Sequence, residues 1–183
     1  MVVGLGNPGA RYARTRHSVG FMIVDRVAET LGASIGKEKF ESLWGEGRLD
    51  SDKVLLIKPQ TFMNLSGRSV RQWISYYHIP LNCTIIIHDD LDLNLGHLKF
   101  GHGGGAGGHK GVESIVRELG SPDIPRLKVG IGRPRYDEPI EDFVLSSFYS
   151  DEQQDVGEIV ARAAVAVETW ISEGISRAMN KFN

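Results

Sequence analysis

The spacing of apolar and polar residues predicts that strands and helices alternate along the chain. Short apolar runs rich in β-branched residues and bounded by Gly or Pro are typical of buried strands. These runs predict strands at residues 2–5, 53–59, 84–89 and 126–132. Apolar residues at helical spacing predict helices at residues 21–31, 66–77, 112–119 and 151–179. This alternation favours an α/β sandwich in which helices flank one twisted mixed β-sheet.

Length and composition indicate one domain spanning residues 1–183, since 183 residues with 41% hydrophobic content can bury a single core. The chain has no apolar run near the ~20 residues of a membrane span, and its first residues do not resemble a signal peptide. We therefore expect a cytoplasmic protein without a membrane partner. The one cysteine, Cys83, lies in the run CTIIIHD, where we expect a buried structural thiol.

Charge is unevenly distributed, although the net charge is only -2. Residues 1–136 hold 18 Lys and Arg against 13 Asp and Glu, a balance of +5. Residues 137–183 hold 3 against 10, a balance of -7. A basic body beside an acidic segment could offer a local phosphate-binding face, and an ordinary solvated surface explains the pattern equally well.

The glycine-rich start GLGNPG, from Gly4 to Gly9, satisfies the G-x-G-x-x-G pattern of dinucleotide sites. In such sites a helix opens directly from the turn, whereas the segment ARYARTRHS that follows is polar and lacks helical period. Pro8 also removes a backbone donor from the turn. Dinucleotide binding is therefore disfavoured. The amide of Asn7, held on a stiff turn, offers both a donor and an acceptor in a fixed direction.

His17, in the segment RHSVGF, is the candidate general base. Either Asp89 or Asp90, at the end of a predicted strand, could bind its Nδ1 and leave Nε2 free to accept a proton from water. Asn64 in the segment FMN could hold the substrate, although purely local backbone bonds would explain it as well, and Ser66 is a candidate cap for the helix that follows. The chain has no G-x-S-x-G elbow, so we expect attack by water instead of a covalent intermediate.

Two further motifs are ambiguous. His88 with the neighbouring aspartates of HDDLD resembles a metal cluster, but alternate residues of a strand face opposite sides, so we expect neither a metal nor another cofactor. The run GGGAGGHKG, from Gly103 to Gly111, would let a phosphate or ribose approach the backbone closely, with Lys110 facing it. A mobile loop without a ligand explains this run equally well.

In their order and spacing, six blocks over nearly the whole chain resemble bacterial peptidyl-tRNA hydrolase. They are GLGNPGARYARTRHSVGF, KPQTFMNLSG, HDDLDL, GGGAGGHKGVESI, RLKVGIGRP and AMNKFN. The resemblance implies a metal-free monomer with peptidyl-tRNA as its partner. It also implies that the protein cleaves the ester bond between the peptide and the 3′-terminal ribose, which recycles tRNA during translation.

The resemblance also implies a role for each matching residue. His17 matches the catalytic base and Asp89 the carboxylate that orients it, while Asn7 and Asn64 match amides that position substrate and water. The remaining implied substrate-binding residues are Tyr12, Phe62, Met63 and Lys110. The implied tRNA-binding residues are Lys99, His109 and Lys128.

Three residues depart from the family pattern. Ser18 and Lys110 each stand where asparagine is common, and Gly101 stands where a basic residue commonly helps to grip the tRNA 5′-phosphate. We expect Ser18 to alter only local hydrogen bonding, and Lys110, if it lies near His17, to disfavour protonation of that base. Two alternative functions remain: an RNA-binding relative that cleaves nothing, and a hydrolase of free esters or peptides. A retained His17 and Asp89 argue against the first, and a basic RNA-facing surface would argue against the second.

Overall fold

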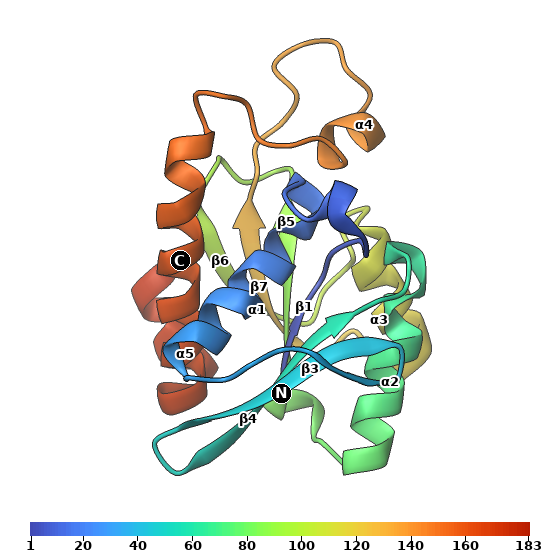
Figure 1. The fold of residues 1–183 in the computed structure, drawn as a ribbon, viewed down its shortest axis with the longest axis vertical. Helices are drawn as coiled ribbons and strands as arrows, with labels where there is room; N and C mark the ends of the chain where they lie inside the picture. The colour runs from blue at the N-terminus through green and yellow to red at the C-terminus, as the bar shows by residue number, and fades with distance from the viewer.

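The computed structural model describes residues 1–183 as a mixed seven-stranded β-sheet with helices on both faces (Figure 1). The strands are β1 (Val2–Gly4), β2 (Lys37–Lys39), β3 (Ser42–Leu49), β4 (Asp52–Pro59), β5 (Ile85–Asp90), β6 (Leu98–His102) and β7 (Pro125–Gly130). The helices are α1 (Val19–Thr30), α2 (Ser66–Tyr77), α3 (Lys110–Leu119), α4 (Ile140–Val144) and α5 (Gln153–Phe182). Short 3-10 turns are η1 (Ala10–Tyr12), η2 (Arg16–Ser18), η3 (Met63–Leu65) and η4 (Leu81–Cys83). The predicted α/β class is confirmed.

The order of the strands creates a topological switch point at β1. The order is β2-β3-β4-β1-β5-β7-β6. Neighbouring strands among β4, β1, β5 and β7 pair parallel, whereas β3 and β6 run in the opposite direction and pair antiparallel with their neighbours. β1 pairs parallel with β4 on one side and with β5 on the other, so the order in which strands are added to the sheet reverses at β1. Ligands bind beyond the carboxyl ends of strands at such a point. In Figure 1 this edge is the upper one, below α4.

Two apolar layers hold the sheet between its helices. Along β5, Ile85 and Ile87 point to one face and pack with α1 and α5, while Ile86 points to the other and packs with α2 and α3. Because both faces of this strand are covered, its sequence is a continuous apolar run without alternation. This explains why the central strands were readable from sequence.

Two glycines let α1 lie unusually close to the sheet. A Cβ on Gly20 of α1 would come within 2.5 Å of the Leu5 nitrogen and 2.6 Å of the Ile87 oxygen. A Cβ on Gly4 of β1 would come within 2.2 Å of the Gly20 oxygen. Only hydrogen atoms fit at these two positions. As a result, η2, which directly precedes α1, lies beside the carboxyl end of β5.

Three strands escaped prediction because their sequences carry little apolar signal. In β3 the buried positions include Gly45 and Gly47, and a Cβ on Gly45 would come within 2.4 Å of the Ser34 oxygen. The three residues of β2 are all charged. In β6 only Leu98 and Phe100 are buried and apolar. Strands with so few apolar residues look like loops in a sequence.

Three local predictions are wrong. Cys83 is exposed, because it ends η4 ahead of β5 and is not part of that strand. Ser66 is the first residue of α2, whose N-cap is Leu65, and its hydroxyl caps nothing. The long C-terminal helix is interrupted at Gly174, where φ is 81°.

None of the helices combines the length and apolarity that crossing a bilayer requires.

Candidate active site

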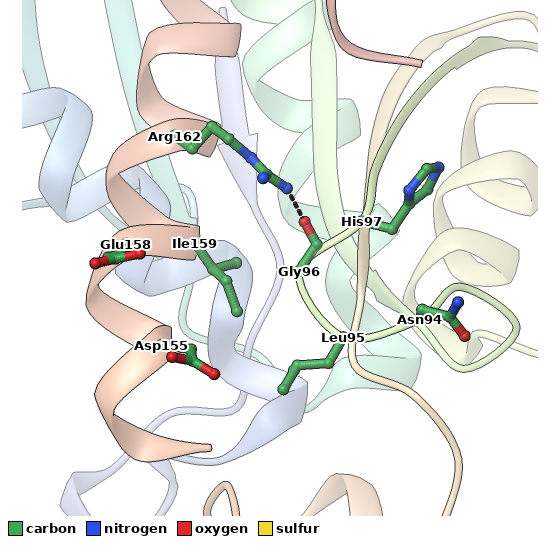
Figure 2. Close-up of a pocket in the computed structure, with 8 residues that line it drawn as sticks. All are labelled: Asn94, Leu95, Gly96, His97, Asp155, Glu158, Ile159 and Arg162. Atoms are coloured by element: carbon green, nitrogen blue, oxygen red, sulfur yellow. Dashed lines mark hydrogen bonds between the residues drawn. The ribbon is translucent and has the colours of Figure 1, made fainter. Parts of the chain in front are cut away.

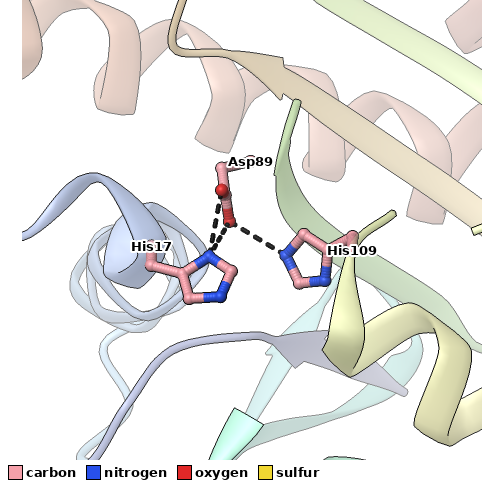
Figure 3. A group of neighbouring side chains, drawn as sticks. All are labelled: His17, Asp89 and His109. Carbon is pink, nitrogen blue, oxygen red and sulfur yellow. Dashed lines mark hydrogen bonds and ion pairs between the residues drawn. The ribbon is translucent and has the colours of Figure 1, made fainter. Parts of the chain in front are cut away.

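His17 and Asp89 meet at the carboxyl edge of the sheet (Figure 3). His17 belongs to η2, and Asp89 is the penultimate residue of β5. The Nδ1 atom of His17 lies 2.9 Å and 3.0 Å from the two carboxylate oxygens of Asp89. Because an ionised carboxylate only accepts hydrogen bonds, Nδ1 carries the hydrogen and Nε2 keeps its lone pair. No protein group bonds to Nε2, and the side chain is 12% exposed.

A second histidine shares the same carboxylate. The Nε2 atom of His109 lies 3.0 Å from Oδ1 of Asp89, and its ring centroid lies 4.8 Å from that of His17. We call His17, Asp89 and His109 the imidazole cluster. His109 is one of the residues for which the family resemblance implies a tRNA contact, but its side chain is only 6% exposed. The glycine-rich loop between β6 and α3 brings it to Asp89, and no periodicity in the sequence indicates how that loop closes.

Electrostatics keep the cluster's carboxylate ionised. Burial raises the pKa of Asp89, but the nearby imidazoles of His109 and His17 and their hydrogen bonds outweigh this, so the pKa lies well below its usual range. Behind the cluster, His88 donates from Nδ1 to the Asp89 carbonyl oxygen at 2.7 Å. Burial, followed by the nearby His109, lowers the pKa of His88 to about 3. His88 is therefore a neutral, buried support for the strand end.

The cluster contains three side chains of metal-ligating types, with one ligand atom from each lying within 4.8 Å of the others. His109, however, accepts hydrogen bonds at Nδ1 from the backbone nitrogens of Gly111 and Val112, at 3.2 Å and 3.3 Å. Its hydrogen must therefore be on Nε2, the atom that faces Asp89. A metal ligand needs a lone pair at that atom, so the residues as arranged do not fit a metal ion.

The aspartates that follow Asp89 do not converge on His88. Asp90 accepts a hydrogen bond from Nζ of Lys128 at 3.0 Å, and Asp92 pairs with Arg133. Burial raises the pKa of Asp90, but the Lys128 hydrogen bond outweighs it and the pKa is lowered. Each carboxylate thus has its own cation.

Asn7 is held by hydrogen bonds at its side-chain oxygen and at its backbone nitrogen. Its Oδ1 accepts from the backbone nitrogen of Met63 at 3.2 Å, and its own backbone nitrogen donates to Oγ of Ser18 at 3.3 Å. Both Asn7 and Ser18 are buried. The bond from Met63 orients the side-chain amide, the bond to Ser18 holds the backbone, and the NH₂ group makes no bond to the protein. Ser18 thus contributes a local hydrogen bond.

The exposed side chains around the cluster form what we call the rim: Phe62, Asn64, Lys110 and Glu141. Phe62 is 62% exposed. Lys110, at the start of α3, places Nζ 2.7 Å from Oε1 of Glu141 in α4. This hydrogen bond raises the pKa of Lys110. The ammonium group is therefore engaged by α4.

The other predicted site residues differ in how far they are exposed to solvent. Met63 is buried, and Tyr12 is half-buried with the Arg11 guanidinium 4.4 Å from its ring centroid. Lys99 is exposed on β6 and is the Cα partner of Lys128 on β7, so both lysines point to the same face of the sheet. This face carries two of the predicted tRNA-binding residues.

A buried arginine, Arg16, directly precedes His17 in η2. Arg16 is 0% exposed and donates to Oγ of Ser146 and to the Ser147 oxygen, both at 2.7 Å. It also pairs with Glu152 at 3.0 Å, and its guanidinium lies 4.0 Å from the ring centroid of Phe143. The acidic C-terminal segment therefore anchors η2 from behind.

The glycine-rich loop is held from below by Arg126 of β7. This buried side chain donates to the carbonyl oxygens of Gly105, Gly104 and Pro122 at 2.7, 2.9 and 3.1 Å. Two of these carbonyl groups belong to the loop that leads to His109, and the third belongs to the segment between α3 and β7. One guanidinium therefore joins the loop to β7 and to that segment.

A separate hollow of about 610 Å³ lies between α5 and the loop joining β5 to β6 (Figure 2). Its lining includes Asp155, Glu158 and Arg162, and Arg162 donates to the Gly96 oxygen. None of the predicted site residues lines it. The hollow is therefore distinct from the imidazole cluster.

Comparisons with known proteins agree over the full length of the chain. The family model described as peptidyl-tRNA hydrolase matches residues 1–183. The peptidyl-tRNA hydrolase of Carboxydothermus hydrogenoformans is 47% identical over 183 residues, covering 100% of this chain and 97% of the relative. That of Shouchella clausii is 43% identical, with 100% and 99% coverage.

Solved structures extend the agreement to the fold. A crystal structure of peptidyl-tRNA hydrolase from Acinetobacter baumannii superposes with a TM-score of 0.93 at 37% identity, covering 100% of this chain and 93% of that chain. The resemblance noted in the sequence is thus confirmed. With the full-length family match, the relatives at more than 40% identity and this superposition, the chain belongs to the peptidyl-tRNA hydrolase family.

Proposed function

We propose that the protein hydrolyses the ester bond that joins a peptide, or an N-blocked aminoacyl group, to the 3′-terminal ribose of tRNA. One observation carries the proposal. The Asp89 carboxylate holds Nδ1 of His17 through both oxygens, at 2.9 Å and 3.0 Å, while Nε2 makes no bond to the protein. This is the arrangement that a general base requires.

The reaction needs only water and this pair. Nε2 of His17 takes a proton from a water molecule whose oxygen bonds to the ester carbonyl carbon. The bond between that carbon and the ribose oxygen then breaks, and the imidazolium returns the proton to the ribose oxygen. Asp89 stabilises the imidazolium without being protonated itself, consistent with its lowered pKa.

The amides and the rim supply positioning. The free NH₂ group of Asn7, whose oxygen is held by Met63, can donate to a carbonyl oxygen of the substrate. We assign Asn64, Met63, Tyr12 and Phe62 to the same substrate site, with Phe62 offering an exposed aromatic face. Lys110 joins them at the rim, bound to Glu141.

The basic face supports tRNA as the alcohol part of the ester. Lys99 and Lys128 lie side by side on β6 and β7, near the end of β5 that carries Asp89. Lysines on this face can bind phosphates of the tRNA acceptor stem when its 3′ end lies at His17. A hydrolase of free esters would gain nothing from them. The proposal extends to a single-domain monomer that acts in the cytoplasm, as expected for an enzyme of translation.

The test is to incubate the purified protein with N-acetyl-aminoacyl-tRNA in EDTA and follow release of deacylated tRNA. A matched N-acetyl-aminoacyl ethyl ester separates tRNA-dependent from general ester hydrolysis. We expect turnover of the tRNA substrate only, falling as salt rises because counterions displace phosphate contacts. Binding of tRNA without turnover would favour the RNA-binding alternative, and equal turnover of both esters would remove tRNA from the proposal.

A further inference from the structure

His109 occupies a position that the mechanism above does not use. It is the N-cap of α3, with Nδ1 accepting from the nitrogens of Gly111 and Val112 while Nε2 donates to Asp89. The two nitrogens of one ring thus join the start of a helix to the carboxylate that holds the base. A protonated His109 would have no lone pair for the helix nitrogens, so this geometry requires a neutral ring.

The consequence for Asp89 is a shared oxygen. Oδ1 lies 2.9 Å from Nδ1 of His17 and 3.0 Å from Nε2 of His109. A hydrogen bond from a neutral donor draws charge density from the carboxylate and lowers its ability to stabilise a cation elsewhere. The attraction between Asp89 and a protonated His17 is therefore weaker than it would be without His109.

We propose that His109 is a positioning residue: a neutral imidazole, fixed by the start of α3, that orients the Asp89 carboxylate and limits how strongly it holds a protonated His17. This role rests on the proposed function and differs from direct contact with tRNA. Loss of the His109 hydrogen bond should therefore strengthen the hold of Asp89 on a protonated His17. His109 also transmits the position of α3, and so of the glycine-rich loop, to the base.

The other charged and titratable groups near His17 and Asp89 are either neutral or paired with another carboxylate. His88 of β5 stacks edge-on against His109, with ring centroids 4.8 Å apart, and burial together with His109 lowers its pKa to about 3, so it adds no charge. Lys128 of β7 is bound to Asp90. Lys110 of α3 directs its ammonium group to Glu141 of α4.

Two substitutions separate the two bonds of His109. In His109→Asn the side-chain oxygen falls near the position of Nδ1, so the helix cap is kept and the donor to Asp89 is lost. In His109→Gln the amide nitrogen falls near the position of Nε2, so the donor is kept and the cap is lost. His102→Asn, at a half-exposed histidine that pairs with Asp123, is the matched control.

The measurement is the pH profile of hydrolysis, with kcat and KM determined separately. We expect His109→Asn to lower kcat roughly tenfold, the equivalent of one charge-assisted hydrogen bond, and to move the acid limb to higher pH, because His17 then protonates more readily. His109→Gln should leave the acid limb of the pH profile where it is in the wild type but lower the melting temperature. The control variant should change neither the acid limb nor the melting temperature. A raised KM for tRNA with unchanged kcat and acid limb in the Asn variant, or the same shifted limb in both variants, would overturn the proposal.

An NMR titration of ¹⁵N-labelled histidine distinguishes failure of this proposal from failure of the proposed function. It requires no substrate. His109 should show a hydrogen on Nε2 throughout the neutral range, and His17 should protonate at a higher pH in His109→Asn than in the wild type. An inactive wild type with these signals would refute the hydrolase assignment alone, whereas a hydrogen on Nδ1 of His109 would refute the role given to this residue.

Discussion

The imidazole cluster and the rim lie at the same edge of the sheet but differ in what fixes their side chains. In the cluster, the side chains are at most 12% exposed and each is bonded to another element: His17 from η2, Asp89 from β5 and His109 from the N-cap of α3. At the rim, Phe62 is 62% exposed, and Lys110 and Glu141 meet as an ion pair in solvent. The protein itself therefore sets the geometry of proton transfer, whereas substrate and salt influence the geometry of the rim.

The largest effect should come from removing the base. His17→Ala should lower turnover of N-acetyl-aminoacyl-tRNA by about 10²- to 10⁴-fold, because general-base catalysis is lost. Binding of tRNA, measured by filter retention, should persist, since the basic face is untouched. His97→Ala, at an exposed histidine lining the separate hollow, is the control. Full turnover by the His17 variant would show that the cluster is not the catalytic centre.

Asp89→Asn should slow turnover by about 10²-fold or more, because an amide no longer holds the correct tautomer of His17. In the double variant with His17→Ala, little further loss is expected, since both residues act on one proton transfer. Single-turnover rates of the three variants measure this coupling. A double variant that lost the product of the two single effects would mean that Asp89 acts independently.

Arg16→Met tests whether the cluster depends on the C-terminal segment. Removing one partner of a buried ion pair should lower the free energy of unfolding by about 3 kcal/mol, because Glu152 loses a buried cation. Turnover should fall with it, since η2 loses its anchor. Urea titration checks the stability, and Arg26→Met, at an exposed pair with Glu29, is the control. Equal midpoints for both variants would contradict an anchoring role.

His88 makes a prediction about acid stability. Its pKa is lowered from 6.5 to about 3 in the folded protein, so the unfolded chain binds its proton first as pH falls. Stability from this group is therefore present above pH 6.5 and is lost as pH falls toward 3. Between pH 7 and 5 the loss should be about 2 kcal/mol. His88→Gln should show a correspondingly flatter pH dependence of its urea midpoint, and parallel curves would contradict the assignment.

The smallest effects belong to the rim. Lys110→Asn should remain active but bind tRNA more weakly at low salt, with a flatter salt dependence, because one cation is lost. Glu141→Gln should do the reverse by releasing the ammonium group for phosphate. Kd values across a salt series measure both. If the two variants change in the same direction, the Lys110–Glu141 pair matters for holding α4 and not for its charge.

The sequence predicted secondary structure best where burial requires a regular pattern of apolar residues. The strands carrying Val3 and Ile86 are apolar runs because both faces are covered, and the helices show apolar spacing because one face is. The position of Asp89 and Asp90 at a strand end indicated that one of them could bind His17, and the family resemblance indicated Asp89. The roles of Arg16 and Arg126 left no such signal, because their partners lie far away in the sequence or are backbone carbonyl groups that any sequence supplies. His109 was assigned to tRNA because a loop conformation, which leaves no periodic signal, decides what it faces.

The missing side chain of Gly20 has a consequence for inhibitor design. The separation between η2 and the end of β5 is set by contact between the backbone of α1 and that of the sheet, with no flexible group between them. A molecule that bridges His17 and the β5 edge would therefore meet a span of fixed length. Even an alanine at position 20 would push the helix away and separate His17 from Asp89. A substitution that gave resistance to such a molecule by widening this gap would therefore also lower the rate of hydrolysis.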